Sequence, residues 1–331
     1  MMKAAYVEQP GPPENLIYGD RPMPEPGEGE VLVKTGALAV NPVDTYARSG
    51  VMPFEVPLPY VVGCDLAGTV EAVGVGVERF SVGDRVYGSN QGLLGRQGSF
   101  AEYVAVDEGW LYPTPDGVSD EEAAALVLVG ITAHLGLVGR AQVKAGESVF
   151  VVGGTGGVGS TVVQMAKALG ARVGTCCGSG AKCEEAKVLG ADYAFNYKEV
   201  GMAEGIAGFA KGGVDVFWET QRSPDFDVAV GALAPRGRMV LMAGRDARPE
   251  FPVGPFYFKQ CRLEGFVMFN CTPDEQRECS VDLNRWMAEG AVKAKVGARF
   301  SLADTGAAHR LQEENTIGGA GTLMGKIVVT P

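Results

Sequence analysis

The sequence predicts an α/β protein of two domains, a doubly wound parallel-sheet domain and a domain of short β-strands. Three observations predict this class: a glycine-rich strand–helix junction near mid-chain, strand–helix alternation around and after it, and short apolar alternations before it. With 331 residues the chain is long enough for two domains, each with its own core.

The glycine-rich junction spans residues 148–170. A β-branched apolar run is followed by Gly154, Gly156 and Gly159, and a helical pattern comes next. This is the G-x-G-x-x-G spacing in its strand–turn–helix context, which lets a pyrophosphate bind the unpaired N–H groups of a helix N-terminus. We predict a dinucleotide site, the alternative being a purely structural βαβ turn. The predicted contacts are Gly154, Thr155, Gly156, Gly157 and Val158.

The end of the next predicted strand indicates the type of cofactor. NAD-binding junctions of this kind carry an acidic residue about 20 positions on, but that place is taken here by residues 177–180. Gly178 and Ser179 leave room for a 2′-phosphate, and Lys182 can supply positive charge. We therefore predict NADPH rather than NADH. The alternative is that Lys182 is an ordinary solvated lysine.

Composition is that of a soluble globular protein, with 46% hydrophobic and 21% charged residues. A net charge of −11 argues against a nucleic-acid or anionic-membrane surface. The N-terminal residues lack the apolar core of a signal peptide, and we expect no apolar run of about 18 residues for a membrane span. Seven cysteines without a disulfide-scaffold spacing predict reduced thiols in a cytoplasmic protein.

Residues 1–121 are dense in proline, glycine and short alternating runs, which predicts a coiled or barrel-like β domain. Its clearest strands are predicted at 30–35, 67–73, 84–88 and 100–106. Ser119 followed by Glu122 is a capping box at the start of an alanine-rich helix. We place the first domain boundary there.

Residues 122–272 alternate between helix and strand, which predicts a parallel sheet covered on both faces. Its strands are predicted at 148–152, 171–177, 193–197, 214–220, 237–244 and 262–268. An amphipathic helix is expected at 274–290, and short strands at 298–302 and 325–331 return to the first domain. The predicted domains are therefore 1–121 with 273–331, and 122–272.

Several stretches taken together resemble the zeta-crystallin-like quinone oxidoreductases, the zinc-free branch of the medium-chain dehydrogenase/reductase superfamily. They occur in family order at residues 41–50, 63–70, 82–86, 130–133, 154–159, 308–309 and 325–329. The resemblance implies a GroES-like β domain and a Rossmann cofactor domain with the active site in the cleft between them. It also implies NADPH as hydride donor and, commonly, a homodimer.

Zinc-dependent relatives have a cysteine and a histidine ligand where this sequence has Asn41 and Cys64. The chain holds only two histidines, His134 and His309, and a catalytic zinc site needs three converging protein ligands. A short glycine-rich loop, residues 91–99, stands where a structural zinc lobe would carry four cysteines. We expect an enzyme without a metal.

The resemblance also implies catalytic residues. Asn41 would lie near the nicotinamide or the substrate carbonyl, the alternative being an Asx-type turn before Pro42. Tyr46 would donate a proton or orient the substrate, and plain packing is its alternative. We expect Asp44 and Arg48 to form a structural pair rather than an acid and a base.

Further cofactor contacts are implied on the parallel-sheet domain, and each of these residues could instead be scaffold. Thr132 would lie near the nicotinamide and Tyr197 beside the adenosine phosphate. Later strand ends, where open α/β sheets bind ligands, would contact the nicotinamide side. These positions are Gly244, Arg245, Phe266, Val267 and Met268.

The predicted activity is NADPH-dependent hydride transfer to quinones or similar conjugated carbonyls. The nearest alternative keeps the fold and reduces the C=C bond of an enal, enone or enoyl thioester. A third is a non-enzymatic NADPH- or RNA-binding protein, although RNA binding predicts a basic stripe that the scattered Lys and Arg do not form. We expect a small-molecule substrate, a homodimer, and no nucleic-acid or membrane partner.

Overall fold

The computed structural model describes residues 1–331 and divides into two compact units. Unit 1 comprises residues 1–128, 271–288 and 294–331, and unit 2 comprises 129–270 and 289–293. The first division falls after residue 128, inside helix α2 (Asp120–His134), and this helix continues unbroken into the π-helical segment η3 (Leu135–Arg140). The predicted cap is confirmed, since the backbone N–H of Glu122 donates to Ser119 Oγ over 3.2 Å.

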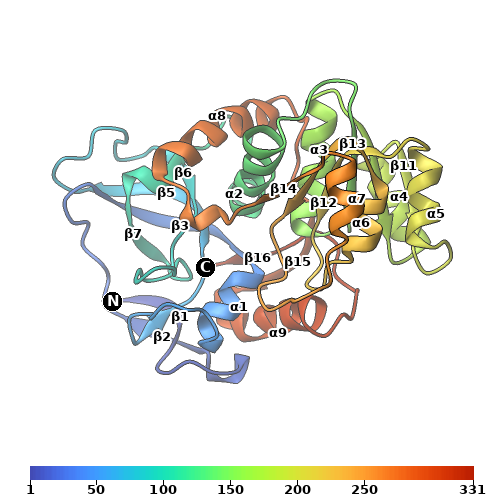
Figure 1. Ribbon diagram of the computed structural model, residues 1–331. Helices are drawn as coiled ribbons and strands as arrows, with labels where there is room; N and C mark the ends of the chain where they lie inside the picture. The colour runs from blue at the N-terminus through green and yellow to red at the C-terminus, as the bar shows by residue number, and fades with distance from the viewer. The chain divides into compact units, whose positions relative to one another are not determined.

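Unit 2 is a doubly wound parallel sheet, as predicted, and its strand order is β11-β10-β9-β12-β13-β14 (Figure 1). Phe150 on β9 packs with Phe209 and Phe217 in one core cluster, while Val149 and Val151, which point to the other face, are fully buried as well. Helices therefore cover both faces. The strands are β9 (Ser148–Val152), β10 (Arg172–Cys177), β11 (Tyr193–Asn196), β12 (Val214–Glu219), β13 (Leu233–Leu241) and β14 (Arg262–Gly265). The helices are α3 (Gly157–Ala168), α4 (Gly180–Val188), α5 (Met202–Phe209), α6 (Phe226–Ala232) and α7 (Val253–Phe258).

Unit 1 is built from antiparallel strands, apart from the parallel pair of β15 and β16. One sheet has the order β15-β16-β3-β5-β6-β8 with β7 on β3, and a smaller sheet has the order β2-β1-β4. Its strands are β1 (Met2–Val7), β2 (Ile17–Arg21), β3 (Glu30–Val40), β4 (Tyr60–Val61), β5 (Asp65–Val73), β6 (Arg85–Gly88), β7 (Tyr103–Asp107), β8 (Leu111–Pro113), β15 (Val296–Ser301) and β16 (Lys326–Thr330). Its other helices are α1 (Pro42–Ser49), α8 (Pro273–Ala288) and α9 (Thr305–Thr316).

Two sequence predictions need correction. The last strand of the parallel sheet is predicted at 262–268. In the structure this strand, β14, ends at Gly265, and a 3-10 turn, η4 (Met268–Asn270), follows it. The continuous helix Asp120–Arg140 has a mean hydropathy of 1.7 over its most apolar window, so an apolar run of spanning length does exist. In this structure 72% of that window is buried, which is also typical of a core helix.

All seven cysteines are free thiols and buried.

Candidate active site

The glycine-rich loop joins β9 to α3, and its glycines are required by the backbone. Gly153 has φ +71°, and the N–H of Gly156 donates to the Gly153 carbonyl over 3.0 Å. A Cβ on Gly159 would lie 2.2 Å from that same carbonyl oxygen. A side chain at 159 would therefore force the helix away from the loop.

The start of α3 can bind an anion. Gly156 is its N-cap, and no side chain caps the helix, so N–H groups of the first turn lack intrahelical acceptors. Gly156 is exposed and Gly157 and Val158 are half-buried, which leaves this end accessible. The helix dipole adds partial positive charge there. A pyrophosphate fits this end of the helix without any basic side chain.

Gly154 and Thr155, which were also predicted as contacts, are buried. The N–H of Gly154 donates to Thr175 Oγ1 on β10 over 2.9 Å. Gly154 can therefore offer close approach of its Cα, but its N–H already has a partner inside the protein.

The ends of β10 and β11, which carry the contacts predicted for the adenosine part of the cofactor, lie next to each other. A Cβ built on Gly178 would lie 3.0 Å from the Tyr197 hydroxyl, and Tyr197 is 47% exposed. Ser179 is the N-cap of α4, because its Oγ accepts the backbone N–H of Lys182 over 3.3 Å. Ser179 thus shapes this turn whether or not it also contacts a ligand.

A second lysine, Lys198, influences the pKa of Lys182. Burial lowers the pKa of Lys182, and the positive charge of Lys198 lowers it further. Lys198 follows Tyr197 directly and was not predicted, although its place next to a predicted contact was a usable signal. The positive charge of Lys198 thus acts on Lys182, and two such charges at this corner of unit 2 favour a phosphate group.

The remaining predicted contacts lie at the carboxyl edge of the same sheet or in α2. Gly244, with φ +87°, and Arg245 follow β13, and Arg245 pairs with Asp246 at 2.8 Å. Phe266 to Met268 follow β14. Phe266 packs edge-on against Trp218 at 6.4 Å between ring centroids, and Met268 is buried. Thr132 is buried in α2.

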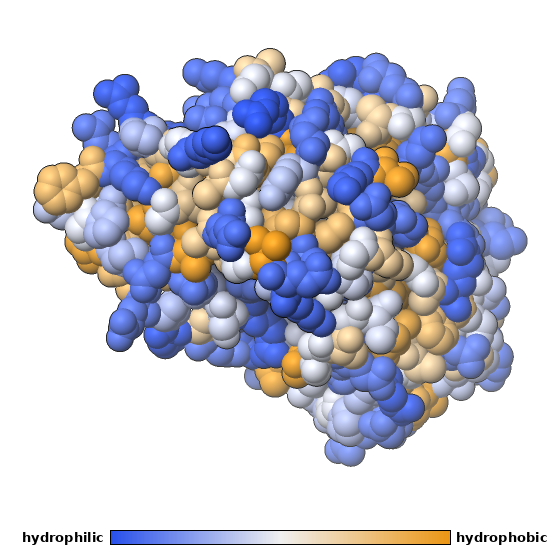
Figure 2. Space-filling model, turned by 90° about the vertical axis from the view of Figure 1, so that its right-hand side faces the viewer, coloured by the Kyte–Doolittle hydropathy of each residue, from blue (hydrophilic) through white to orange (hydrophobic).

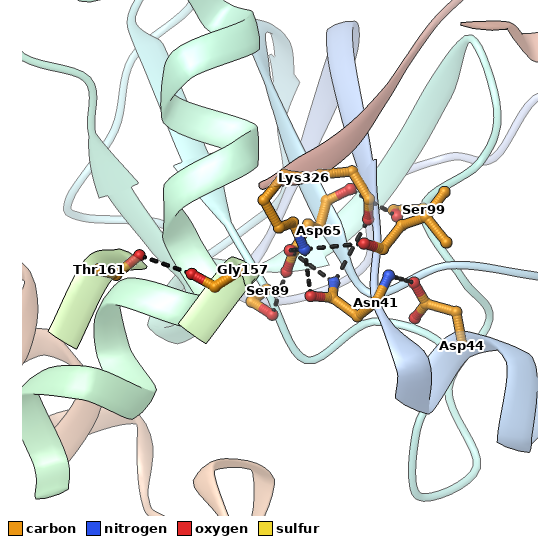
Figure 3. A network of polar contacts seen from close by, with 10 residues as sticks. Asn41, Asp44, Asp65, Ser89, Ser99, Gly157, Thr161 and Lys326 are labelled. Carbon is orange, nitrogen blue, oxygen red and sulfur yellow. Dashed lines mark hydrogen bonds and ion pairs between the residues drawn. The ribbon is translucent and has the colours of Figure 1, made fainter. Parts of the chain in front are cut away.

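The catalytic candidates Asn41 and Tyr46 belong to unit 1. Asn41 is the N-cap of α1, and its backbone N–H donates to Asp44 Oδ2 over 2.7 Å. Tyr46 lies half-buried on the same helix. Figure 3 shows the Asn41 amide inside a polar network. Its Nδ2 donates to Asp65 Oδ2 over 2.7 Å, and its Oδ1 accepts from Lys326 Nζ. The network therefore fixes the orientation of the Asn41 amide.

This network is fully buried and rich in ionisable groups. Lys326 Nζ lies 3.8 Å from Asp65 Oδ2, and Ser89 donates to Asp65 Oδ1 over 2.6 Å. Burial raises the pKa of Asp44 to about 7 and raises that of the Cys64 thiol, while burial lowers the pKa of Lys326. Sequence reasoning missed Asp65, Ser89 and Lys326 as members of this site.

The expected pairing of Asp44 with Arg48 is wrong. Arg48 forms its ion pair with Glu313 of α9, and its Nε donates to the Gly11 carbonyl over 3.1 Å. Asp44 instead contacts the Asn41 N–H and the Cys64 thiol. The two side chains point to different neighbours, because Arg48 extends toward α9 whereas Asp44 caps the start of its own helix.

The donor set around Asn41 and Cys64 does not fit zinc. No three His, Cys, Asp or Glu side chains of the chain gather into a group that could hold a metal ion. Burial and the neighbouring carboxylates of Asp44 and Asp65 raise the pKa of the Cys64 thiol, whereas zinc binds a thiolate. The ammonium group of Lys326 lies among the same residues and would repel a divalent cation.

Comparison with known proteins defines the class. Residues 27–116 match the alcohol dehydrogenase GroES-like domain, and residues 157–286 match the domain described as zinc-binding dehydrogenase. This order of domains confirms the predicted fold and is that of a medium-chain dehydrogenase/reductase.

Individual relatives narrow this class. The human protein named quinone oxidoreductase is 32% identical over 99% of this chain and 98% of its own. A mycobacterial protein solved in complex with NADPH is 33% identical over the whole of both chains, with a TM-score of 0.86. A structure described as an NAD-dependent alcohol dehydrogenase is 32% identical over both whole chains, with a TM-score of 0.89. The chain belongs to the quinone oxidoreductase family and is an oxidoreductase.

Proposed function

We propose that this enzyme uses NADPH to reduce quinones or similar conjugated carbonyls and that it does so without zinc. NADPH, when bound, supplies the hydride. The mycobacterial neighbour described with NADPH and the human relative named quinone oxidoreductase support this proposal. Another neighbour is described as NAD-dependent. The preference of this enzyme for NADPH is therefore argued from its own residues.

The observation that carries the proposal is the approach of Gly178 to Tyr197, at a corner of unit 2 where Lys182 and Lys198 are close in sequence to these two residues. The N-terminus of α3 binds the pyrophosphate, and the turn from Gly178 to Ser179 admits the adenosine ribose. Lys182 and Lys198 then supply the charge that a 2′-phosphate needs and that NADH cannot use.

In unit 1 we assign contact with the substrate to Tyr46 and a positioning role to Asn41, which is fully buried. The network around Asn41 holds its amide in one orientation and thereby fixes the start of α1, the helix that carries Tyr46. The Tyr46 phenol orients the acceptor and can provide the proton that follows the hydride. Hydride transfer then depends on orientation and exclusion of water rather than on a strong acid or base.

The decisive assay is NADPH oxidation in the presence of EDTA, with ortho- and para-quinones compared with enals, enones and crotonyl-CoA. Turnover of quinones that EDTA does not reduce is expected. Turnover of only the alkenals or thioesters would instead establish the C=C reductase alternative. Absence of NADPH binding would refute the enzyme proposal, and tight RNA binding in its place would favour the non-enzymatic alternative.

Lys198→Ala tests the choice of cofactor directly. We expect KM for NADPH to rise about tenfold, as the loss of one charge-assisted contact predicts, with KM for NADH unchanged. Lys187→Ala is the matched control, since Lys187 pairs with Glu184 on the outside of α4. An equal effect of Lys198→Ala on both cofactors would contradict a 2′-phosphate site.

We also propose a homodimer formed through the free edge of unit 2. Strand β14 pairs only with β13, so its other edge offers unpaired backbone groups. Next to it, α7 exposes Val253, Tyr257 and Phe258, with Phe258 78% exposed. Figure 2 presents the side on which α4, α5 and β11 lie, at the other end of the sheet order from β14, and there hydrophobic residues (orange) are intermixed with hydrophilic ones (blue). A second copy would cover both the edge and the apolar side chains.

A further inference from the structure

Thr175 lies on β10, next to Gly154 of the glycine-rich loop. It belongs neither to the glycine motif nor to the predicted cofactor contacts. Its side chain is fully buried, and in the sheet it is the register partner of Val151 on β9. A threonine at a buried position of a parallel strand needs partners for its hydroxyl. Both partners lie at the end of β9.

The Thr175 hydroxyl makes two hydrogen bonds that tie the loop to the sheet. Oγ1 donates to the Val151 carbonyl over 2.6 Å and accepts the N–H of Gly154 over 2.9 Å. The fit is tight, because a Cβ on Gly154 would lie 2.4 Å from Thr175 Oγ1. The Thr175 side chain therefore requires glycine at 154.

We infer that Thr175 is a positioning residue for the phosphate-binding loop, an inference that rests on the proposed use of NADPH. By holding Gly154 against β10, its hydroxyl sets the path of the loop from Thr155 to Gly157. The N–H groups that follow at the start of α3 are thereby presented to the pyrophosphate before the cofactor arrives. Such preorganisation raises affinity because less order is lost on binding.

Valine at position 175 keeps the shape of threonine and removes the hydroxyl. The N–H of Gly154 would then have no acceptor, and an unsatisfied buried donor is costly enough that the loop would shift to hydrate it. A shifted loop no longer matches the pyrophosphate. Serine keeps the hydroxyl and loses only a methyl group, so it should restore the loop.

The test compares Thr175→Val and Thr175→Ser by fluorescence titration with NADPH. We expect Thr175→Val to raise Kd about tenfold and Thr175→Ser to remain within about threefold of the wild type. In steady-state assays KM for NADPH should rise in Thr175→Val, while kcat at saturating NADPH is kept. Thr35→Val is the matched control, since Thr35 Oγ1 donates to the Ala101 carbonyl over 2.6 Å in unit 1. It should lower the melting temperature and leave Kd unchanged.

The outcomes separate this inference from the proposed function. A wild-type protein that fails to bind NADPH refutes both. A wild type that binds NADPH while Thr175→Val binds equally well, or while Thr175→Ser is as weak as Thr175→Val, refutes the role of the hydroxyl alone. If Thr175→Val does not fold, hydrogen exchange of the Gly154 amide in the cofactor-free wild type tests whether the Thr175 hydroxyl holds this amide. Protection supports the inference, and exchange at the rate of an exposed amide overturns it.

Discussion

His309 on α9 is fully buried, and neither of its ring nitrogens has a hydrogen-bond partner. It packs edge-on against Phe100, with ring centroids 6.0 Å apart. Burial and the nearby charge of Arg48 lower the pKa of His309 to about 3. The fold therefore holds a neutral imidazole throughout the physiological range, at a position where a positive charge would have no compensation.

This burial predicts a specific loss of stability in acid. Between pH 6.5 and 3 the unfolded chain binds a proton at His309 that the folded protein excludes, so the free energy of unfolding falls as pH is lowered. The slope from this one group approaches about 1.4 kcal/mol per pH unit. Urea unfolding at pH 7, 6 and 5 should show a shallower slope for His309→Gln than for the wild type. Equal slopes would contradict the lowered pKa.

At the scale of elements, the π-helical segment η3 is shaped by one side chain of the neighbouring sheet. A Cβ on Gly136 would lie 2.1 Å from the fully buried ring of Trp218. Gly139 in the same segment has open space around its Cα. The close approach of helix and strand thus depends on glycine at 136 and not at 139.

Gly136→Ala should therefore destabilise the protein by about 1–3 kcal/mol, the usual range for overpacking a core. Gly139→Ala should be neutral or slightly stabilising, because alanine restricts the unfolded chain without any clash. Thermal and denaturant unfolding of the two variants provide the measurement. A similar loss in both would mean that helix propensity, and not contact with Trp218, decides the effect.

At the scale of the whole molecule, the free edge of β14 and the apolar side chains of α7 make association the expected state. Phe258→Asp places a charge in the proposed interface. The molecular mass measured by analytical ultracentrifugation should then fall from that of two chains to that of one. Val188→Asp is the control, because Val188 is 82% exposed on α4, at the opposite end of the sheet order from β14. A wild type that sediments as one chain would contradict the dimer.

Local sequence signals predicted much of this protein. The β9–loop–α3 junction, the Ser119 cap and the alternation of strands and helices in unit 2 follow from glycine spacing, capping residues and apolar runs, which act over a few residues. The predicted fold class and family were confirmed. The assigned roles of Asn41, Tyr46 and the cofactor contacts stay predictions.

Only the tertiary structure could decide which side chains meet. Lys326 bonds to Asn41 from 285 positions away, Thr175 bonds to Gly154 from the next strand, and Arg48 pairs with Glu313 instead of its neighbour Asp44. No periodicity or motif encodes such pairs, since they depend on how strands and helices pack. The sequence by itself determined the elements and the phosphate-binding junction, because these arise from backbone preferences and local hydrogen bonds. Packing decided the buried network that holds Asn41 and the hydroxyl that holds the loop, because burial forces each polar group to find a partner wherever the fold supplies one.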